Sequence, residues 1–156
     1  DKKTWIIIAI IIAIFAGIIG FGIINRSPAE DRLAQIFPAS EESGNLPENI
    51  DGNPNASILI FDYSDYQCEH CASINPLLNQ LVEEYDGKVA VVYRNFVQSY
   101  HANGTAAASA ANAAAIQGYW KEYKDLLFAN QNEWYSASAS ARQELFEKYF
   151  TTVTKG

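Results

Sequence analysis

The chain opens with a long apolar run, which is the strongest pattern in the sequence. Residues Trp5–Ile24 contain no charged side chain and place apolar residues on every face of a helix. A helix of about 20 residues rises ~30 Å, the thickness of the hydrocarbon core of a bilayer. The pattern predicts a single transmembrane anchor at 5–24. Because a secretory signal has an apolar core of only ~7–15 residues and a small-residue cleavage site, a retained anchor is favoured over a cleaved signal.

Charges on the two sides of this run predict its orientation. Two lysines precede it, and Arg26 is the only basic residue close behind it. Because cytoplasmic flanks carry the excess of Lys and Arg, residues 1–4 are expected in the cytoplasm and the remainder outside the cell membrane. Residues 25–51 are rich in Pro, Gly, Ser, Asn and Glu. This composition predicts an extracytoplasmic linker with one short helical turn near Asp31–Phe37.

Behind the linker, the spacing of apolar residues predicts a strand, a helix and a second strand. Ser57–Tyr63 is a short run of apolar and aromatic residues, typical of a buried strand. Over Cys68–Tyr85 apolar residues recur at spacings of three and four, as on a helix, with Pro76 inside it. Lys88–Val97 is again strand-like. Strand, helix and strand in this order predict a parallel pair with a right-handed crossover.

No further strand is predicted after this unit. Three helices are expected instead, at 102–117, 119–131 and 141–150, the first of them rich in alanine. Residues 52–156 are therefore expected to form one α/β domain, with the predicted helices at about 101–150. The 18 acidic and 11 basic residues give a net charge of −7. This surplus argues against a nucleic-acid partner, since such binding rests on Lys and Arg.

Redox chemistry is indicated by Cys68 and Cys71, the only two cysteines in the chain. Residues three apart at the start of a helix share one face, close enough for their sulfurs to bridge. The first lies where unpaired backbone N–H groups and the helix dipole favour a thiolate. Cys68 is therefore expected to attack and Cys71 to act as the resolving thiol. Persistently free structural thiols are not expected outside the cytoplasm.

Two alternatives to redox chemistry stay open for the pair. A purely structural disulfide in a tethered adaptor would close a very short loop, with little entropic benefit. A metal-handling or redox-inert binding module would use Cys68, Cys71 and His101 as ligands, and a carboxylate such as Asp62 could complete the set. The redox interpretation requires no cofactor.

Two further side chains are candidates for the site. Asp62 ends the first predicted strand, six residues before Cys68. It is either a buried acid that exchanges a proton with the resolving thiol or an exposed residue that caps the loop. His70 lies between the two cysteines and favours a thiolate when it is protonated, while the negative charge of Glu69 opposes this effect.

The segment Phe61–Ala72, with Cys-Glu-His-Cys near its end, resembles the active-site region of the DsbA-like thiol-disulfide oxidoreductases of the thioredoxin superfamily. Gly52–Ala56 is similar to the family's lead-in to this segment, and Pro76 to the proline that kinks its active-site helix. Residues 93–131 resemble the family's inserted helices. The resemblance implies an α/β, thioredoxin-like fold with an inserted helical subdomain.

The resemblance also implies roles and partners. By motif position Cys68 is the nucleophile, Cys71 the resolving thiol, His70 a tuning residue and Asp62 a buried acid. The implied activity is the formation or exchange of disulfides in exported proteins that carry thiols or disulfides. A membrane redox partner is expected to recycle the enzyme. An oxidase is favoured over an isomerase or reductase, because no dimerisation segment is visible.

The chain departs from the family pattern in two ways. Glu69 stands where the family commonly has proline or another uncharged residue, and its charge disfavours the Cys68 thiolate. None of the five prolines lies after Pro76, although the family's fold continues with a strand preceded by a cis-proline that faces the cysteines. We therefore expect a C-terminal truncation, which leaves the fold incomplete and the motif strand without a neighbour on one side.

Overall fold

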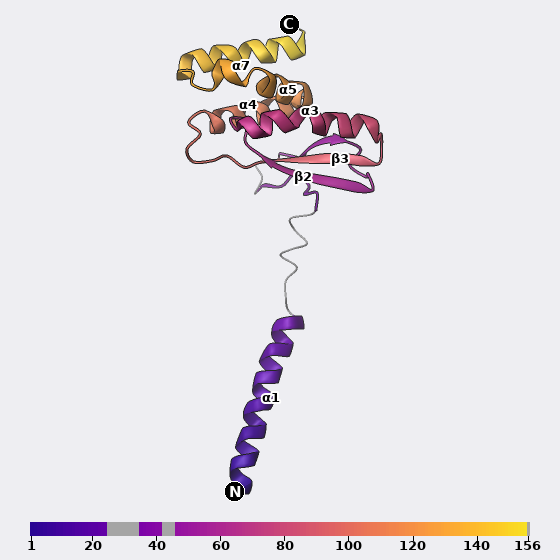
Figure 1. Cartoon of the computed structure of the whole chain (residues 1–156), viewed down its shortest axis with the longest axis vertical. Coiled ribbons are helices and arrows are strands. Elements are labelled where there is room, and N and C mark those ends of the chain that lie inside the picture. The colour runs from indigo at the N-terminus through magenta and orange to yellow at the C-terminus, as the bar shows by residue number, and fades with distance from the viewer. Residues whose placement is uncertain (25–34, 42–45, 156) are drawn as a thin grey trace. The chain divides into compact units, whose positions relative to one another are not determined.

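The computed structural model describes residues 1–24, 35–41 and 46–155. The chain divides into two compact units, Asp1–Gln35 and Ile36–Gly156. All strands of the described residues and all helices from α3 onward belong to the second unit (Figure 1).

In the described part of the first unit, residues 1–24 and 35, there is one helix, α1, over Lys2–Ile24. Among the described residues, no helix is both long and apolar enough to cross a membrane, so the predicted anchor is not confirmed. Most of the helical turn predicted near Asp31–Phe37 lies outside the described residues, as do 25–34 and 42–45 of the predicted linker.

The sheet of the second unit has the strand order β1-β3-β2. β2 covers Ile58–Ser64 and β3 covers Val89–Asn95, and the two run parallel, with Asp62 opposite Tyr93. This arrangement confirms the predicted parallel pair. Among the described residues β2 pairs with β3 alone, so it lies at the edge of the sheet, as predicted for the motif strand.

The sequence does not predict β1, which covers Asn49–Gly52 and begins inside the stretch 25–51 expected to be a linker. β1 runs antiparallel to β3. Its residues Asn-Ile-Asp-Gly include a single large apolar side chain, so pairing with β3 decides its conformation rather than a local pattern. Gly52 has a φ of 96°, and a Cβ there would lie 2.9 Å from the carbonyl oxygen of Val89. Glycine is the residue that fits both constraints.

The helix α3 covers Glu69–Glu84 and connects the two parallel strands. Cys68 is its N-cap, and Pro76 lies inside it. The helix predicted over Cys68–Tyr85 is therefore confirmed to within one residue at each end. α3 packs against β1 and β3 on one side and against α5 on another. A four-residue loop, 65–68, connects the carboxyl end of β2 to the first turn of α3.

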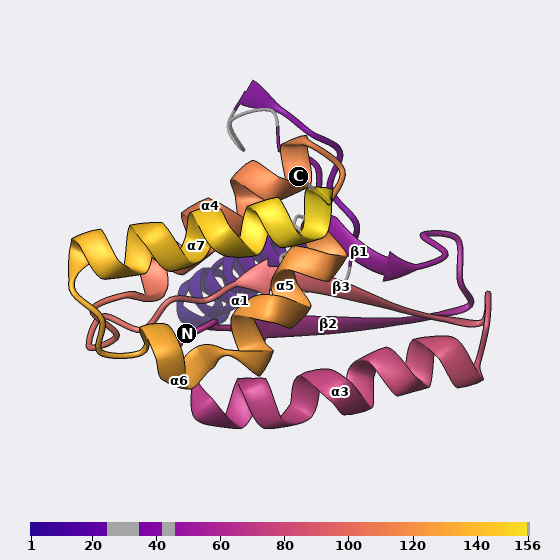
Figure 2. The same cartoon turned by 90° about the horizontal axis from the view of Figure 1, so that it is seen from above.

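A layer of helices follows β3 in the described chain and lies, with α3, over one face of the sheet (Figures 1 and 2). Its members are α4 (Gly104–Ile116), α5 (Trp120–Ala129), α6 (Gln131–Trp134) and α7 (Ala139–Thr154). Three of them confirm the predicted helices. The sequence misses α6, because a single turn is too short to show a helical period.

Small and aromatic residues share the core of this layer. The fully buried side chains include Ala107, Ala111, Ala114, Leu127 and Trp134. The alanines let α4 approach its neighbours closely, so they serve packing as well as helix propensity.

Side chains alternate along β2, and this alternation decides what faces the helices. On one side the guanidinium of Arg94 lies 4.8 Å from the ring of Phe61. On the other side Tyr93, opposite Asp62, packs with its ring 6.3 Å from that of Phe128 in α5. The even-numbered side chains of β2, Asp62 among them, therefore face the helical layer.

Candidate active site

Cys68 lies at the junction between the loop after β2 and α3. Its backbone N–H donates to the carbonyl oxygen of Asp65 at 3.0 Å, which closes a tight turn. As N-cap, Cys68 accepts the backbone N–H of Cys71 at its Sγ, 3.4 Å away. The sulfur therefore sits at the helix terminus, where N–H groups without partners inside the helix stabilise negative charge.

Cys71 lies one turn further along and is half-buried. Burial raises the pKa of its thiol, and hydrogen bonding to the Asp65 backbone N–H and to the Ser64 hydroxyl lowers it. The neighbouring Cys68 raises it again, so the net shift is upward. At neutral pH Cys71 is therefore a thiol, which must lose a proton before it can attack a disulfide. Both cysteines are free in this structure.

Asp62 lies on the face of β2 that is turned toward the helices. It is half-buried, and its Oδ1 accepts the Ser64 hydroxyl at 2.5 Å. Burial raises the pKa of this carboxyl, and the Ser64 hydrogen bond and the positive charge of Lys124 only partly offset the rise. Asp62 is therefore partly shielded from solvent, and its role as the acid for the resolving thiol stays a prediction.

His70 and Glu69 are exposed in the first turn of α3. The His70 carbonyl oxygen accepts the hydroxyl of Ser73 at 2.8 Å. Solvent weakens the effect of an exposed charge on its neighbours. The tuning role of His70 therefore stays a prediction.

His101 is tied to the loop before Cys68 rather than to the cysteines. Its Nδ1 lies 2.7 Å from Oδ2 of Asp65. In the part of the chain that the structure describes, no group of three or more His, Cys, Asp and Glu side chains could hold a metal ion. The ligand set of Cys68, Cys71 and His101 left open by the sequence is therefore not assembled among those residues.

Asp65 organises the loop that carries Cys68, and sequence reasoning missed it. The residue is 2% exposed. Its Oδ1 accepts the backbone N–H of Gln67 at 2.8 Å, and its Oδ2 accepts the backbone N–H of Gln98 at 2.8 Å beside His101. Gly104 lets α4 approach, because a Cβ there would lie 2.8 Å from Oδ1. In the sequence Asp65 looks like an ordinary turn residue, and Gln98 lies 33 positions away.

Buried amide side chains fasten the helical layer to the same loop. Gln67 accepts the backbone N–H of Asn103 at 2.7 Å and donates to the carbonyl oxygen of Tyr135 at 2.8 Å. Gln131 of α6 donates to the carbonyl oxygen of Tyr66 at 2.8 Å. Because these buried groups are paired, their desolvation is offset. The loop before Cys68 is thus held from two sides.

Lys124 brings a buried positive charge near the site. It is 3% exposed, and its Nζ donates to Oδ1 of Asn75 and of Asn79 at 2.8 Å each. Oδ1 of Asp125 lies 3.1 Å away. Burial lowers the pKa of Lys124, and Asp125 opposes that shift. The charge of Lys124 is among the causes that lower the pKa of Asp62, although α5 follows β2 by more than 50 positions.

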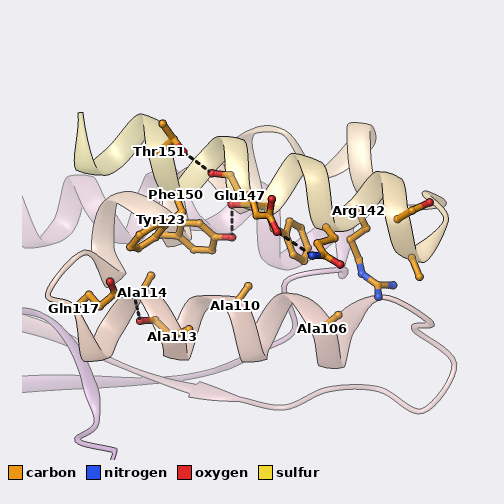
Figure 3. A pocket seen from close by; sticks show the side chains of 14 residues that line it. Ala106, Ala110, Ala113, Ala114, Gln117, Tyr123, Arg142, Glu147, Phe150 and Thr151 are labelled. Carbon is orange, nitrogen blue, oxygen red and sulfur yellow. Dashed lines mark hydrogen bonds between the residues drawn. The ribbon is translucent and has the colours of Figure 1, made fainter. Parts of the chain in front are cut away.

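Two cavities lie in the helical part of the domain, and residues of the cysteine helix α3 line the smaller one. One of about 810 Å³ lies between α4 and α7, where Figure 3 shows Ala106, Ala110 and Ala113 opposite Phe150 and Glu147. Its lining includes no residue of the loop or of α3. The other, of about 250 Å³, is lined by Ala72 of α3 and by residues of α5. The smaller cavity is therefore the one beside the cysteine helix.

Solved structures with a similar fold include DsbA-like proteins. A variant of alpha-DsbA1 from Wolbachia pipientis is 20% identical, with a TM-score of 0.55 over 69% of this chain and 54% of that one. The catalytic domain of ScsC from Proteus mirabilis is 17% identical, with a TM-score of 0.57 over 67% of this chain and 58% of that one. These likenesses confirm the predicted thioredoxin-like α/β fold with helices.

The curated relatives that the chain matches are named as Na(+)/H(+) antiporters. The Na(+)/H(+) antiporter NhaA 3 of Salinispora tropica is 29% identical over 141 residues, which cover 85% of this chain and 22% of that protein. An antiporter NhaA 1 of Mycobacterium sp. is 30% identical over 87 residues, 55% of this chain and 14% of that protein. The chain thus spans about a fifth or less of the length of these relatives.

One family match covers most of the chain. Residues 45–155 match the family model described as thioredoxin. The match runs from just before β1 to the end of α7, so it takes in the sheet, the cysteine helix and the helical layer. The chain therefore belongs to the thioredoxin family.

Proposed function

We propose that the protein is a thiol-disulfide oxidoreductase that forms or exchanges disulfides in exported proteins through Cys68 and Cys71. One observation carries the proposal: Sγ of Cys68 accepts the backbone N–H of Cys71 at the N-terminus of α3, with the second thiol in the same turn. A helix N-terminus favours a thiolate on the first sulfur, and the short spacing favours ring closure by the second.

In the oxidising direction, the disulfide between Cys68 and Cys71 reacts with a substrate thiolate. The substrate sulfur attacks Sγ of Cys68, the bond between the two cysteines breaks, and Cys71 leaves as a thiolate that takes up a proton. A second substrate thiolate then attacks the substrate sulfur of the mixed disulfide, so the substrate disulfide forms and Cys68 leaves as a thiolate. The protein has gained two electrons, which a membrane redox partner takes up to restore the bridge.

Asp62 supplies the acid and base of this cycle. It gives a proton to Cys71 when that sulfur leaves and takes it back when Cys71 attacks. Positioned proton transfer of this kind contributes about 10²–10⁴-fold to a rate. The upward shift of the Asp62 pKa supports the assignment, because it makes the carboxyl a better partner for a thiol near neutral pH. His70, when protonated, favours the Cys68 thiolate.

The proposal includes a location in the cell membrane. A single pass over 5–24 would leave residues 1–4 in the cytoplasm and the redox domain outside, where exported substrates are found. Support comes from the uncharged run and the two lysines before it. Apolar side chains of α1 are also exposed, with Ile12 and Phe15 at 62% each. Extraction of cell membranes with alkaline carbonate tests this part: the full chain should stay in the pellet, and recovery in the supernatant would contradict it.

Antiport is not proposed for this chain, although the curated relatives are named as antiporters. The aligned stretch covers only 22% of the first of them. It also covers most of the residues that match the thioredoxin family. We infer that a similar thioredoxin-like region forms part of those longer proteins.

Alkylation trapping of the purified full chain across a glutathione redox series tests the redox activity. The wild type should pass reversibly between a form with two alkylated thiols and a form with none. With a disulfide-containing peptide, Cys71→Ser should accumulate a mixed disulfide at Cys68, because the resolving thiol is missing, and Cys68→Ser should not. Glu84→Gln, an exposed position at the end of α3, is the matched control. Wild-type thiols that never form a reversible bridge would refute the proposal.

A further inference from the structure

The cavity of about 250 Å³ between α3 and α5 lies on the face of α3 that begins with Cys68. Three of its lining residues, Ala72, Asn75 and Asn79, follow Cys68 by four, seven and eleven positions. Positions with this spacing share one face of a helix, so the cavity continues the line of the N-cap cysteine. Asn75 lies seven residues after Cys68, which is a rise of ~10 Å. A polypeptide bonded to Cys68 can therefore reach the cavity along α3.

The lining of this cavity combines apolar walls with a carboxylate. The apolar walls come from both helices and are formed by Ala72, Pro76, Phe128 and Ala129. Asp125 of α5 supplies the carboxylate. Sites for whole small molecules usually measure about 300–1,000 Å³, so the cavity has the size of a side chain rather than of a cofactor. A side chain with an apolar stem and a polar head matches such a lining.

The carboxylate of Asp125 has one oxygen in use. Its Oδ1 accepts the side-chain amide N–H of Asn75 at 2.8 Å and that of Asn79 at 2.9 Å, and lies 3.1 Å from Nζ of Lys124. Burial raises the pKa of Asp125, but the two amide hydrogen bonds and the charge of Lys124 lower it by more, so the carboxyl is ionised at neutral pH. Among the described residues no donor contacts Oδ2, which is not buried. This oxygen is available to a donor from another molecule.

The charges around Asp125 favour a cation. Lys124 does not line the cavity, since it is 3% exposed and its Nζ is surrounded by oxygens of Asn75, Asn79 and Asp125. Glu122, which is exposed, precedes Asp125 by three positions and shares its face of α5. Two carboxylates are therefore set against one buried ammonium group, and the chain as a whole carries a net charge of −7.

We propose that this cavity binds a lysine or arginine side chain of the substrate polypeptide while the substrate cysteine is bonded to Cys68. The inference rests on the redox function proposed above and adds a sequence preference to it. The methylene groups of the bound side chain pack against Pro76 and Phe128, and its charged head donates to Oδ2 of Asp125. An extended chain spans ~3.3 Å per residue, so a path of ~10 Å places the basic residue three or four positions from the substrate cysteine.

Exchange with matched peptides tests this preference. The reduced full chain is mixed with a peptide whose single cysteine is bonded to an aromatic thiol. Cys68 attacks the peptide sulfur, and the aromatic thiolate leaves with the electron pair of the broken bond and absorbs visible light. Two peptides carry a lysine four residues before or after the cysteine, and a reference peptide of the same composition carries it ten residues away. We expect one of the two near peptides to be captured about fivefold faster than the reference, as for a partly exposed ion pair.

Variants show whether the cavity causes the preference. Asp125→Asn removes the charge, and the ratio of near to reference rates should fall to about one. Ala129→Phe, at an exposed position of the lining, fills the cavity without changing the charge and should have the same effect. Glu84→Gln, at an exposed carboxylate near the end of α3, is the matched control and should keep the ratio. Because both rates are measured on the same protein, a change in the reactivity of Cys68 cancels from the ratio.

A measurement on the wild type keeps the proposal testable if a variant fails to fold. The ratio should fall toward one as the salt concentration rises, because salt screens a partly exposed ion pair. Equal capture of near and reference peptides would overturn the cavity assignment and leave the redox function standing. So would a ratio that salt or Asp125→Asn leaves unchanged, or one that Glu84→Gln abolishes. If the wild type captures no peptide, the redox function itself is refuted, and the cavity assignment with it.

Discussion

Replacement of Asp65 by asparagine should loosen the loop that carries Cys68. The carboxylate of Asp65 accepts two backbone N–H groups, from Gln67 at Oδ1 and from Gln98 at Oδ2, both at 2.8 Å. Oδ2 also lies 2.7 Å from Nδ1 of His101, which must carry the proton of that contact, since a carboxylate only accepts. Asparagine has the same shape but a single acceptor oxygen. The amide group can take two orientations, and in neither can it accept hydrogen bonds from all three donors.

The cost of each orientation follows from these contacts. With its oxygen in place of Oδ2, the substituted amide would keep Gln98 and His101 but turn its NH₂ toward the N–H of Gln67. That loss amounts to about 1.5–3 kcal/mol, the usual worth of a hydrogen bond to a charged group. The other orientation loses two donors and costs about twice as much. Loss of charge assistance at His101 adds to the cheaper case, so we expect Asp65→Asn to lower the free energy of unfolding by about 3 kcal/mol.

Urea unfolding of the full chain measures this effect. The midpoint should fall without a change in the slope, since the surface exposed on unfolding is the same. Asp86→Asn, at an exposed aspartate in the turn after α3, is the control and should change stability by less than about 0.5 kcal/mol. A loss below about 1 kcal/mol in Asp65→Asn would refute the reasoning, because it would mean that water or a small loop movement replaces the lost acceptor.

Three further predictions concern the surroundings of the site. Gly104→Ala should lower the free energy of unfolding in urea by about 1–2 kcal/mol. The added Cβ would lie 2.8 Å from Oδ1 of Asp65, and this clash outweighs the ~1 kcal/mol that alanine gains over glycine in a helix. A gain in stability would contradict the packing. Burial raises the pKa of Asp62 above its ordinary 3.8, so the wild type loses stability as pH rises through the folded pKa, and Asp62→Asn should become more stable relative to it over that range in paired urea titrations. Equal pH dependence of the two proteins would contradict this sign. Lys124→Met should lower the free energy of unfolding in urea by about 2–4 kcal/mol, because it leaves Asp125 without its cation. It should also raise the pKa of Asp62 in the pH profile of exchange, because the lysine charge lowers that pKa. An unmoved profile would show that Lys124 does not act on the acid.

Local patterns predict most of the elements that support the site. The parallel strands and α3 follow from apolar spacing alone, because each is long enough to show its period. Cys68 and Cys71 can be identified as the candidate redox pair from the sequence, since they are the only cysteines and their spacing places both in one helical turn. Asp62 is found from the sequence as well, by its place at the end of a strand that leads to the cysteine motif.

The sequence by itself therefore determined the β-α-β frame, the cysteine pair and the candidate acid. Only the tertiary structure decided what surrounds them. It added β1 to the sheet, gave Asp65 its donors from the segment after β3, and placed Lys124 near the acid. These features rest on contacts between residues far apart in the chain, whose polar side chains look like surface residues until the fold buries and pairs them.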